Sequence, residues 1–179
     1  NVVTTNGHAD EYVRFAAADL LLLAQADSTS SDPLEQENSR RLEENYRRLK
    51  AATDQNGRPF RIVRVPLPHP IISTMEPGDG IYDYISTLDY QDGSQFPVGQ
   101  PVHVIAAASY LNFLVANGCV LMPTYWKAGM DAKVQARDEE VRAILQSAFP
   151  NKIIIPIDAL AVNFGGGGIH CITMNEPRQ

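Results

Sequence analysis

One part of the chain has the pattern of a compact unit of two strands, a helix and a third strand. Residues 110–116 and 119–122 are apolar segments joined by an Asn-Gly dipeptide, which is a turn signal typical of a β-hairpin. Residues 133–148 repeat apolar side chains at helical spacing, and residues 153–157 form a continuous apolar run. Such a run is typical of a strand that is buried on both faces. The segment therefore predicts a ββαβ unit within an α+β fold.

An earlier part of the chain ends in the same way. Residues 20–23 and 61–65 each predict a strand, because both are apolar runs of strand length. Between them, Asp32 is placed to cap a helix that begins at Pro33 and continues to about residue 52. Glu35 completes a pattern like a capping box. The shared helix-strand ending hints at repeated modules.

The remaining segments are less regular. Residues 10–15 predict a short helix, residues 102–107 a strand, and residues 160–164 another strand. Residues 66–101 are punctuated by Pro and Gly but keep several tyrosines, so we expect an excursion or lid rather than a disordered linker. The 179 residues suit one domain, 1–179, that contains this excursion.

Charge and composition exclude several classes of function. The formal net charge is −6, whereas nucleic acid and anionic membranes require clustered Lys and Arg. No apolar run approaches the roughly 20 residues that span a bilayer. Cys119 and Cys171 are too few for a disulfide framework, which favours a reducing, cytoplasmic compartment. We therefore expect no nucleic-acid partner and no membrane partner.

A run of four glycines leads directly into a cysteine. Gly165–Gly168 are followed by Ile-His and then Cys171, and glycines allow positive φ and a close approach of backbone to ligand. A phosphate-binding loop would require a following Lys-Ser/Thr and a helix, which are absent from the sequence pattern. A flexible linker fits poorly between two predicted strands. Cys171 is therefore a candidate nucleophile, with Gly167 and Gly168 bordering the substrate, whereas Cys119 in an apolar strand is expected to be inert.

A nucleophilic cysteine requires a proton shuttle, and the start of the chain offers one. His8 and Asp10 are two residues apart after a glycine, so in an extended segment they point to the same side. His8 is the candidate shuttle, and Asp10 either orients it or pairs with a cationic substrate. The alternative is a polar surface turn. A metal site is less well supported, because these residues match no close ligand spacing, and we expect His69 and His103 to be structural or exposed.

Three separated segments carry a resemblance to a known family. Residues 165–173, Gly-Gly-Gly-Gly-Ile-His-Cys-Ile-Thr, resemble the cysteine-bearing signature of agmatine deiminases and bacterial-type peptidylarginine deiminases. Residues 7–15 resemble their Gly-His-x-Asp-x-x-x-Arg-Phe segment, and residues 107–113 look like a third agmatine deiminase segment. The order of the three segments is the same as in the family, and together they are similar to its C-terminal portion.

The resemblance implies a fold and a chemistry. The fold would be part of a pentein propeller, about three of five ββαβ modules around a pseudo-fivefold axis. The enzyme would be a hydrolase without metal or cofactor that converts agmatine to N-carbamoylputrescine and ammonia. By this analogy Cys171 attacks the guanidinium carbon and forms an amidino-thioether, His8 protonates the departing ammonia and then activates water, and Asp10 holds the guanidinium nitrogens.

Two departures from the family leave alternatives open. Gly168 stands where agmatine deiminases usually have Asn, and Met174-Asn175 stand where they usually have two glutamines. Family members are also much longer, and their earlier half supplies another carboxylate and a tryptophan for the substrate. The alternatives are a peptidylarginine deiminase, a thiol amidinotransferase, or a non-catalytic chain that requires a complementary N-terminal chain or a homo-oligomer.

Overall fold

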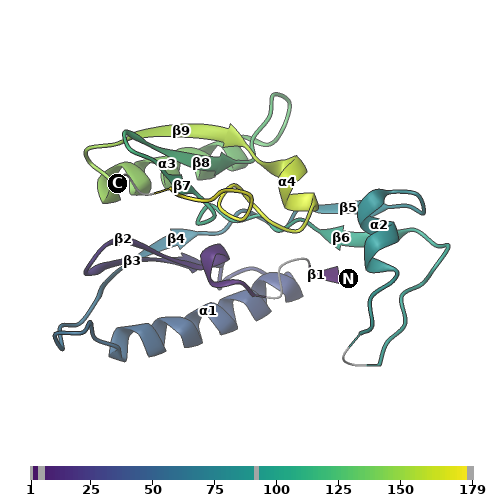
Figure 1. Cartoon of the computed structure of the whole chain (residues 1–179), viewed down its shortest axis with the longest axis horizontal. Coiled ribbons are helices and arrows are strands. Elements are labelled where there is room, and N and C mark those ends of the chain that lie inside the picture. Colours follow the sequence, from purple (N-terminus) through teal and green to yellow (C-terminus); the bar gives the residue numbers. More distant parts are fainter. Residues whose placement is uncertain (1, 4–6, 91–92, 177–179) are drawn as a thin grey trace.

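A computed structural model describes residues 2–3, 7–90 and 93–176 of the chain. Within these residues the strands form three-stranded sheets in the orders β2-β3-β4, β7-β8-β9 and β1-β6-β5 (Figure 1). The α+β class is therefore confirmed. The elements are η1 (Ala9–Glu11), β1 (Val2–Val3), β2 (Val13–Ala17), β3 (Leu20–Gln25), α1 (Pro33–Ala51), β4 (Arg61–Pro66), β5 (Ile72–Met75), α2 (Gly80–Ile85), β6 (Val102–Ile105), β7 (Leu114–Val115), β8 (Cys119–Thr124), α3 (Ala132–Ala148), β9 (Ile153–Asp158) and α4 (Leu160–Phe164).

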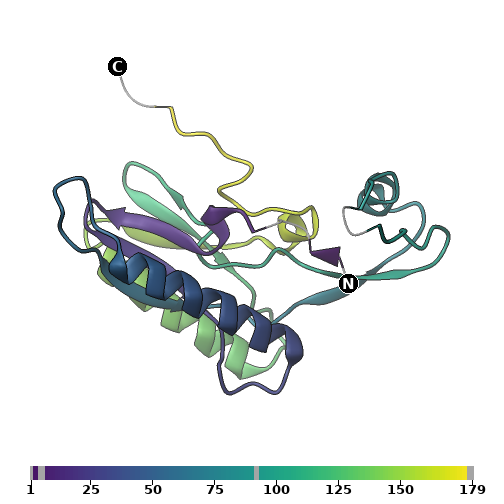
Figure 2. The ribbon, with the colours of Figure 1, turned by 90° about the horizontal axis from the view of Figure 1, so that it is seen from below.

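Two units share one topology, as the sequence hinted. In each, the first two strands are antiparallel, and a helix then leads to a third strand that is parallel to the second. These units are β2-β3-α1-β4 and β7-β8-α3-β9. Figure 2 shows α1 and α3 on one side of the molecule and the C-terminal segment on the other. The repeated modules are therefore a property of the structure, and the predicted ββαβ unit is confirmed.

At the start of α1 the predicted cap by Asp32 is present, but the predicted capping box with Glu35 is not. Asp32 accepts hydrogen bonds from the backbone N–H groups of Leu34 (2.7 Å) and Glu35 (3.2 Å), which would otherwise lack partners. The Glu35 side chain instead lies 3.0 Å from His69 Nδ1, and the Asp32 N–H donates to Ser30. The predicted capping box was therefore wrong, because a tertiary partner holds the glutamate.

The predicted excursion, residues 66–101, contains regular structure. Its β5 pairs antiparallel with β6, and α2 packs the buried Tyr82 against Met75 and Val104. The Tyr82 hydroxyl donates to the backbone carbonyl of Gln100 at 3.0 Å, which ties the helix to the end of the excursion. This part of the chain therefore has a small apolar cluster of its own. Its role as a lid stays a prediction.

Several predictions of secondary structure or burial were wrong. Residues 160–164 form the helix α4 rather than a strand, because a short apolar run fits either element. Residues 10–15 divide between the 3-10 turn η1 and strand β2. Strand β9 exists, but Ile153 is 70% exposed and Ile155 37% exposed, so only one face of this strand is covered in the chain.

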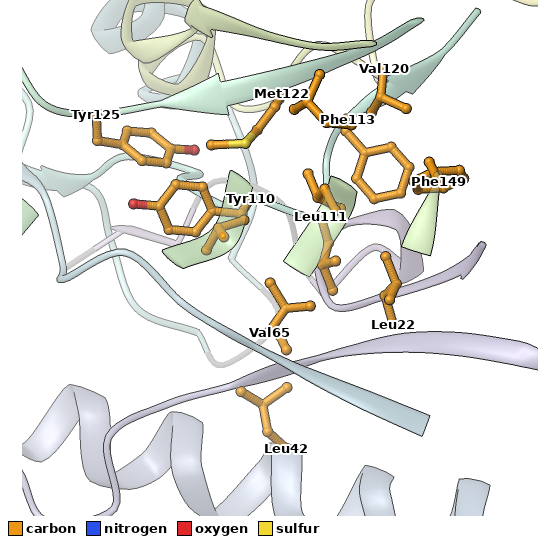
Figure 3. Close-up of a cluster of buried hydrophobic side chains, with 14 of the residues drawn as sticks. Leu22, Leu42, Val65, Tyr110, Leu111, Phe113, Val120, Met122, Tyr125 and Phe149 are labelled. Atoms are coloured by element: carbon orange, nitrogen blue, oxygen red, sulfur yellow. The ribbon is translucent and has the colours of Figure 1, made fainter. Parts of the chain in front are cut away.

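The segment predicted as a strand at residues 110–116 is mostly a buried loop. Only Leu114 and Val115 pair with β8. The preceding residues are apolar because they fill the space between the two units, as Figure 3 shows for Tyr110, Leu111 and Phe113. Arg14 of β2 fixes this loop by donating to the carbonyl oxygen of Phe113 at 2.9 Å. The loop thus carries the residues beside Phe113 into the centre of the molecule.

The buried carboxylate of Asp138 anchors α3 to the end of β8. Asp138 accepts hydrogen bonds from the Tyr110 hydroxyl (2.6 Å) and from the backbone N–H groups of Tyr125 (3.1 Å) and Trp126 (2.9 Å). Each donor is left without a partner if the carboxylate is removed.

Within the described ranges, every helix is too short or too polar to cross a bilayer.

Replacing Asp138 with alanine is expected to destabilise the chain by about 3 kcal/mol, because unpaired buried polar groups cost more than the hydrogen bonds contribute. Chemical denaturation of the purified chain measures the change. The matched control is the adjacent Glu139→Ala, since the Glu139 side chain is 65% exposed on the same helix. Equal free energies of unfolding for the two variants would contradict this role of Asp138.

Candidate active site

Three segments that are far apart in the sequence meet at one point. The turn η1 supplies Asp10 and Glu11, the buried loop before β7 supplies Asn112, and the turn after α4 supplies His170 and Cys171. Hydrogen bonds join them across more than 50 residues of sequence in every case. Asp10 and Cys171, which are 161 residues apart in the sequence, therefore lie beside each other.

Asp10 receives three donors on one carboxylate oxygen. Its Oδ2 lies 2.7 Å from His170 Nδ1, 3.2 Å from Asn112 Nδ2 and 3.5 Å from Cys171 Sγ. Desolvation opposes ionisation of this group, but the contacts with His170 and Cys171 outweigh it and lower the pKa of Asp10. Asp10 is therefore a negative charge held directly beside the thiol.

Glu11 is a second carboxylate in contact with the thiol, and the sequence analysis did not identify it. Glu11 is only 9% exposed, and its Oε1 lies 2.8 Å from Asn112 Nδ2 and 3.6 Å from Cys171 Sγ. Burial, together with the neighbouring charge of Asp10, raises the pKa of Glu11 to about 7. The site thus contains a glutamate that gains or loses a proton near neutral pH.

Cys171 lies at the surface, but its sulfur faces the two carboxylates. Desolvation raises the pKa of the Cys171 thiol, and Asp10 raises it further, whereas hydrogen bonds from Gly168 and Asn112 lower it. The balance is upward, so without a cation nearby the thiol holds its proton more firmly than a free cysteine. Cys119, in contrast, is a free cysteine partly buried in β8.

The histidine that contacts Asp10 is not the one that the sequence predicted. His8 is exposed and precedes η1, where its side chain makes no capping hydrogen bond. His170, for which the sequence predicted no role, is the histidine in contact with Asp10. Within the described residues the expected pairing of Asp10 with His8 is therefore replaced by pairing with His170. The shuttle role of His8 stays a prediction.

The glycine run serves close packing more than unusual backbone conformation. Of its four members only Gly166 has a positive φ, at 90°. A Cβ atom at Gly167 would lie 3.0 Å from Cys171 Cβ, and one at Gly168 would lie 2.4 Å from Asn112 Oδ1. The run therefore lets the cysteine turn pack directly on its neighbours. The predicted contact of Gly167 and Gly168 with substrate stays a prediction.

The side chains of this cluster suit an organic cation that carries several N–H groups. The described residues contain no group of three or more His, Cys, Asp or Glu side chains placed to hold a metal ion. Asp10 and Glu11 each present a carboxylate oxygen in contact with the same sulfur. Paired carboxylates of this kind bind guanidinium and ammonium groups through charge-assisted hydrogen bonds.

Comparison with known proteins assigns the chain to a family. A family model described as Porphyromonas-type peptidyl-arginine deiminase matches residues 2–177, and the chain belongs to this family. The agmatine deiminase of Pseudomonas aeruginosa (strain LESB58) is 32% identical over 173 residues, and that of Medicago truncatula is 29% identical over 174. Each alignment covers 97% of this chain and 41% of the relative.

Solved structures give the same result. The structure of agmatine deiminase of Enterococcus faecalis matches with a TM-score of 0.66 and 26% identity, over 97% of this chain and 41% of that chain. The Campylobacter jejuni agmatine deiminase, at 21% identity and a TM-score of 0.55, shares the fold over 92% of this chain. The chain spans about two fifths of the length of these relatives.

The pKa of Glu11 predicts how stability depends on pH. Because the folded chain holds the proton up to about pH 7, whereas an ordinary glutamate releases it near 4.5, stability falls as pH rises through this window. We expect Glu11→Gln to be more stable than the parent near pH 8 by about 1–2 kcal/mol.

At a pH below the ordinary pKa of glutamate, the two proteins should unfold at the same denaturant concentration, because Glu11 is then protonated in both states. Glu76 is exposed and makes its hydrogen bonds through its backbone N–H and carbonyl groups, so Glu76→Gln is the control. A Glu11→Gln variant that is less stable than the parent at high pH would show that the charged form is the favoured one.

Proposed function

We propose that this chain carries the nucleophile and part of the substrate site of an amidine hydrolase that converts agmatine to N-carbamoylputrescine and ammonia. The observation that carries the proposal is the position of the Cys171 sulfur, 3.5 Å from Asp10 Oδ2 and 3.6 Å from Glu11 Oε1. A thiol in contact with two carboxylates is suited to a planar cation, because the carboxylates can hold its nitrogens while the sulfur approaches its carbon. The similarity to agmatine deiminases supports agmatine as the substrate.

The reaction requires two steps. The Cys171 thiolate attacks the guanidinium carbon, the bond from that carbon to a terminal nitrogen breaks, and the nitrogen takes up a proton and leaves as ammonia. Water then attacks the resulting amidino-thioether, and the carbon–sulfur bond breaks to return the thiolate and release the carbamoyl product. We assign the two proton transfers to His8 by analogy with the family, and the binding of the guanidinium nitrogens to Asp10.

The substrate itself would activate the nucleophile. In the free site, desolvation and the charge of Asp10 raise the pKa of the Cys171 thiol, so little thiolate is present. A bound guanidinium places a positive charge beside Asp10, Glu11 and Cys171 at once, and an opposite charge within about 4–6 Å favours the ionised forms. The thiolate would therefore form chiefly when the correct cation is bound.

We further propose that the two ββαβ units and the third sheet are consecutive parts of a pentein propeller of five modules. The exposed isoleucines of β9 support this, since Ile153, Ile155 and Ile157 lie on a sheet face that is left open by the helices of the described residues. In the complete enzyme this face would be covered by a complementary N-terminal portion or by a second copy of the chain.

Two free cysteines are consistent with a cytoplasmic location.

A second substrate is supported by a separate observation. The matching family model is described as a peptidyl-arginine deiminase, and residues 171–176 are exposed, as a site for an arginine side chain on a peptide would require. A non-catalytic role for the isolated chain is the third candidate, because the relatives are much longer.

Ammonia release distinguishes the three. The purified chain is assayed alone, and again together with the N-terminal portion of the Pseudomonas relative, on agmatine and on a peptide containing arginine. Release from agmatine in preference to the peptide supports the proposal, and the reverse preference supports a peptidylarginine deiminase. If neither substrate releases ammonia from a stable complex of the two chains, the hydrolase proposal is wrong.

A further inference from the structure

Asn112 has more contacts within the site than any residue assigned a role so far. Its residue is 0% exposed. Its amide nitrogen lies 2.8 Å from Glu11 Oε1, 3.2 Å from Asp10 Oδ2 and 3.2 Å from Cys171 Sγ. Its amide oxygen accepts from the backbone N–H groups of His170 (2.8 Å) and Cys171 (3.4 Å). One neutral side chain thus contacts both carboxylates, the sulfur and the backbone that carries the sulfur.

We propose that Asn112 is a positioning residue that holds the Cys171 sulfur in contact with Asp10 and Glu11 and supplies the hydrogen-bond donor that stabilises the thiolate there. This inference rests on the proposed function only in that Cys171 is taken as the nucleophile. Asn112 itself touches neither the substrate nor the departing ammonia in this account. It acts through the cysteine and the two carboxylates.

The chemistry of the amide fits this position better than its alternatives. An amide nitrogen has two hydrogens, and here it faces three acceptors that repel one another when all are ionised. A lysine or arginine would neutralise the carboxylates that the cationic substrate requires. An aspartate would add another negative charge beside the sulfur and raise the thiol pKa. A neutral donor lowers the repulsion among the three groups and leaves their net charge unchanged.

The loop that carries Asn112 is fixed independently of these contacts. The Ser109 hydroxyl donates to the carbonyl oxygen of Glu11 at 2.5 Å, which joins the loop to η1. Arg14 donates to the carbonyl oxygens of Leu111 (3.2 Å) and Phe113 (2.9 Å), which are the neighbours of Asn112 in the chain. The amide therefore reaches the sulfur from a rigid support, as a preorganised donor requires.

The chain also contains a matched control. Asn163 is likewise 0% exposed, and its amide nitrogen donates to the carbonyl oxygen of Gly167 at 2.8 Å. It holds the same glycine turn, yet its side-chain amide donates to the backbone and not to the sulfur. Replacing it removes a buried amide of the same type near Cys171 and leaves the donor to the thiolate in place.

The test is the rate of alkylation of the full chain by iodoacetamide as a function of pH, which requires no substrate and no turnover. A Cys119→Ala background confines the reaction to Cys171. Asn112→Ala is expected to shift the midpoint of the profile upward by about one pH unit, because a hydrogen bond to a charged acceptor is lost. Asn163→Ala should destabilise the fold but leave the midpoint of the parent unchanged.

Asn112→Asp keeps the acceptor oxygen and the shape, so it keeps the inference testable if the alanine variant does not fold. It is expected to shift the midpoint upward by at least as much as Asn112→Ala. An unchanged midpoint in the folded variants of Asn112, or an equal shift in Asn163→Ala, would overturn the positioning role. Either outcome is separate from a failure of the proposed function, which concerns ammonia release alone.

Discussion

Replacing Cys171 with alanine is expected to reduce ammonia release from agmatine to the background of the assay, a loss of at least about 10³-fold. The alanine retains the backbone contacts of the turn but has no group that can bond to the guanidinium carbon. The loss is measured from initial rates at saturating agmatine. The assembly used is the complex of the chain with the N-terminal portion of the Pseudomonas relative. The fold should be retained, because Cys171 is exposed and its removal leaves no large cavity.

Cys119→Ala is the matched control for this experiment. Cys119 is the other free cysteine, and it lies partly buried in β8, away from the carboxylates. Its replacement should leave the rate of ammonia release close to that of the parent. If ammonia release survives in Cys171→Ala and disappears in Cys119→Ala, the nucleophile is Cys119, and our assignment of Cys171 is wrong.

The second large effect is expected at Gly168. A Cβ atom there would lie 2.4 Å from Oδ1 and 2.6 Å from Cγ of Asn112, which is closer than such atoms approach in proteins. Because Asn112 is fully buried and bonded on all sides, Gly168→Ala must displace it and, with it, the sulfur. We expect the rate of ammonia release to fall by about 10²-fold, as small misplacements of reacting groups do.

Gly118→Ala provides the comparison, since a Cβ atom at Gly118 meets nothing within 4 Å. That variant should keep the rate of the parent. The experiment also bears on the departure from the family noted above, in which agmatine deiminases usually have Asn where this chain has Gly168. Full activity in Gly168→Ala would mean that Asn112 can move without cost, and the account of the packed turn would fail.

Local sequence signals predicted the units of the fold. The Asn-Gly turn before β8, the cap at Asp32 and the helical spacing in α3 depend on neighbours in sequence, and the structure has all three. The errors occurred where tertiary packing decides. Tyr110 and Phe113 lie in a loop that is enclosed by the two units, and a buried loop requires apolar residues. The loop therefore has the composition of a buried strand. The exposed face of β9 could not be predicted either, because an apolar run does not reveal which faces the chain covers.

The candidate site could be predicted only in part for a similar reason. Asp10 and Cys171 stood out because their residue types and neighbours suggest chemistry. Glu11 and Asn112 had no such signal, since a charged residue in a turn is usually solvated and an Asn in an apolar segment is usually a turn residue. Their importance comes from burial beside the sulfur, which arises from contacts between residues about 60 to 160 positions apart.

The most direct test of the central claim is the mass of the protein during turnover. The assembly is mixed with agmatine, quenched in acid within the first turnovers, and examined by intact-mass and peptide mass spectrometry. The account predicts a species heavier by agmatine less ammonia, with the added mass on the peptide that contains Cys171. Release of ammonia with no such adduct on Cys171, or with the adduct on another residue, would contradict it.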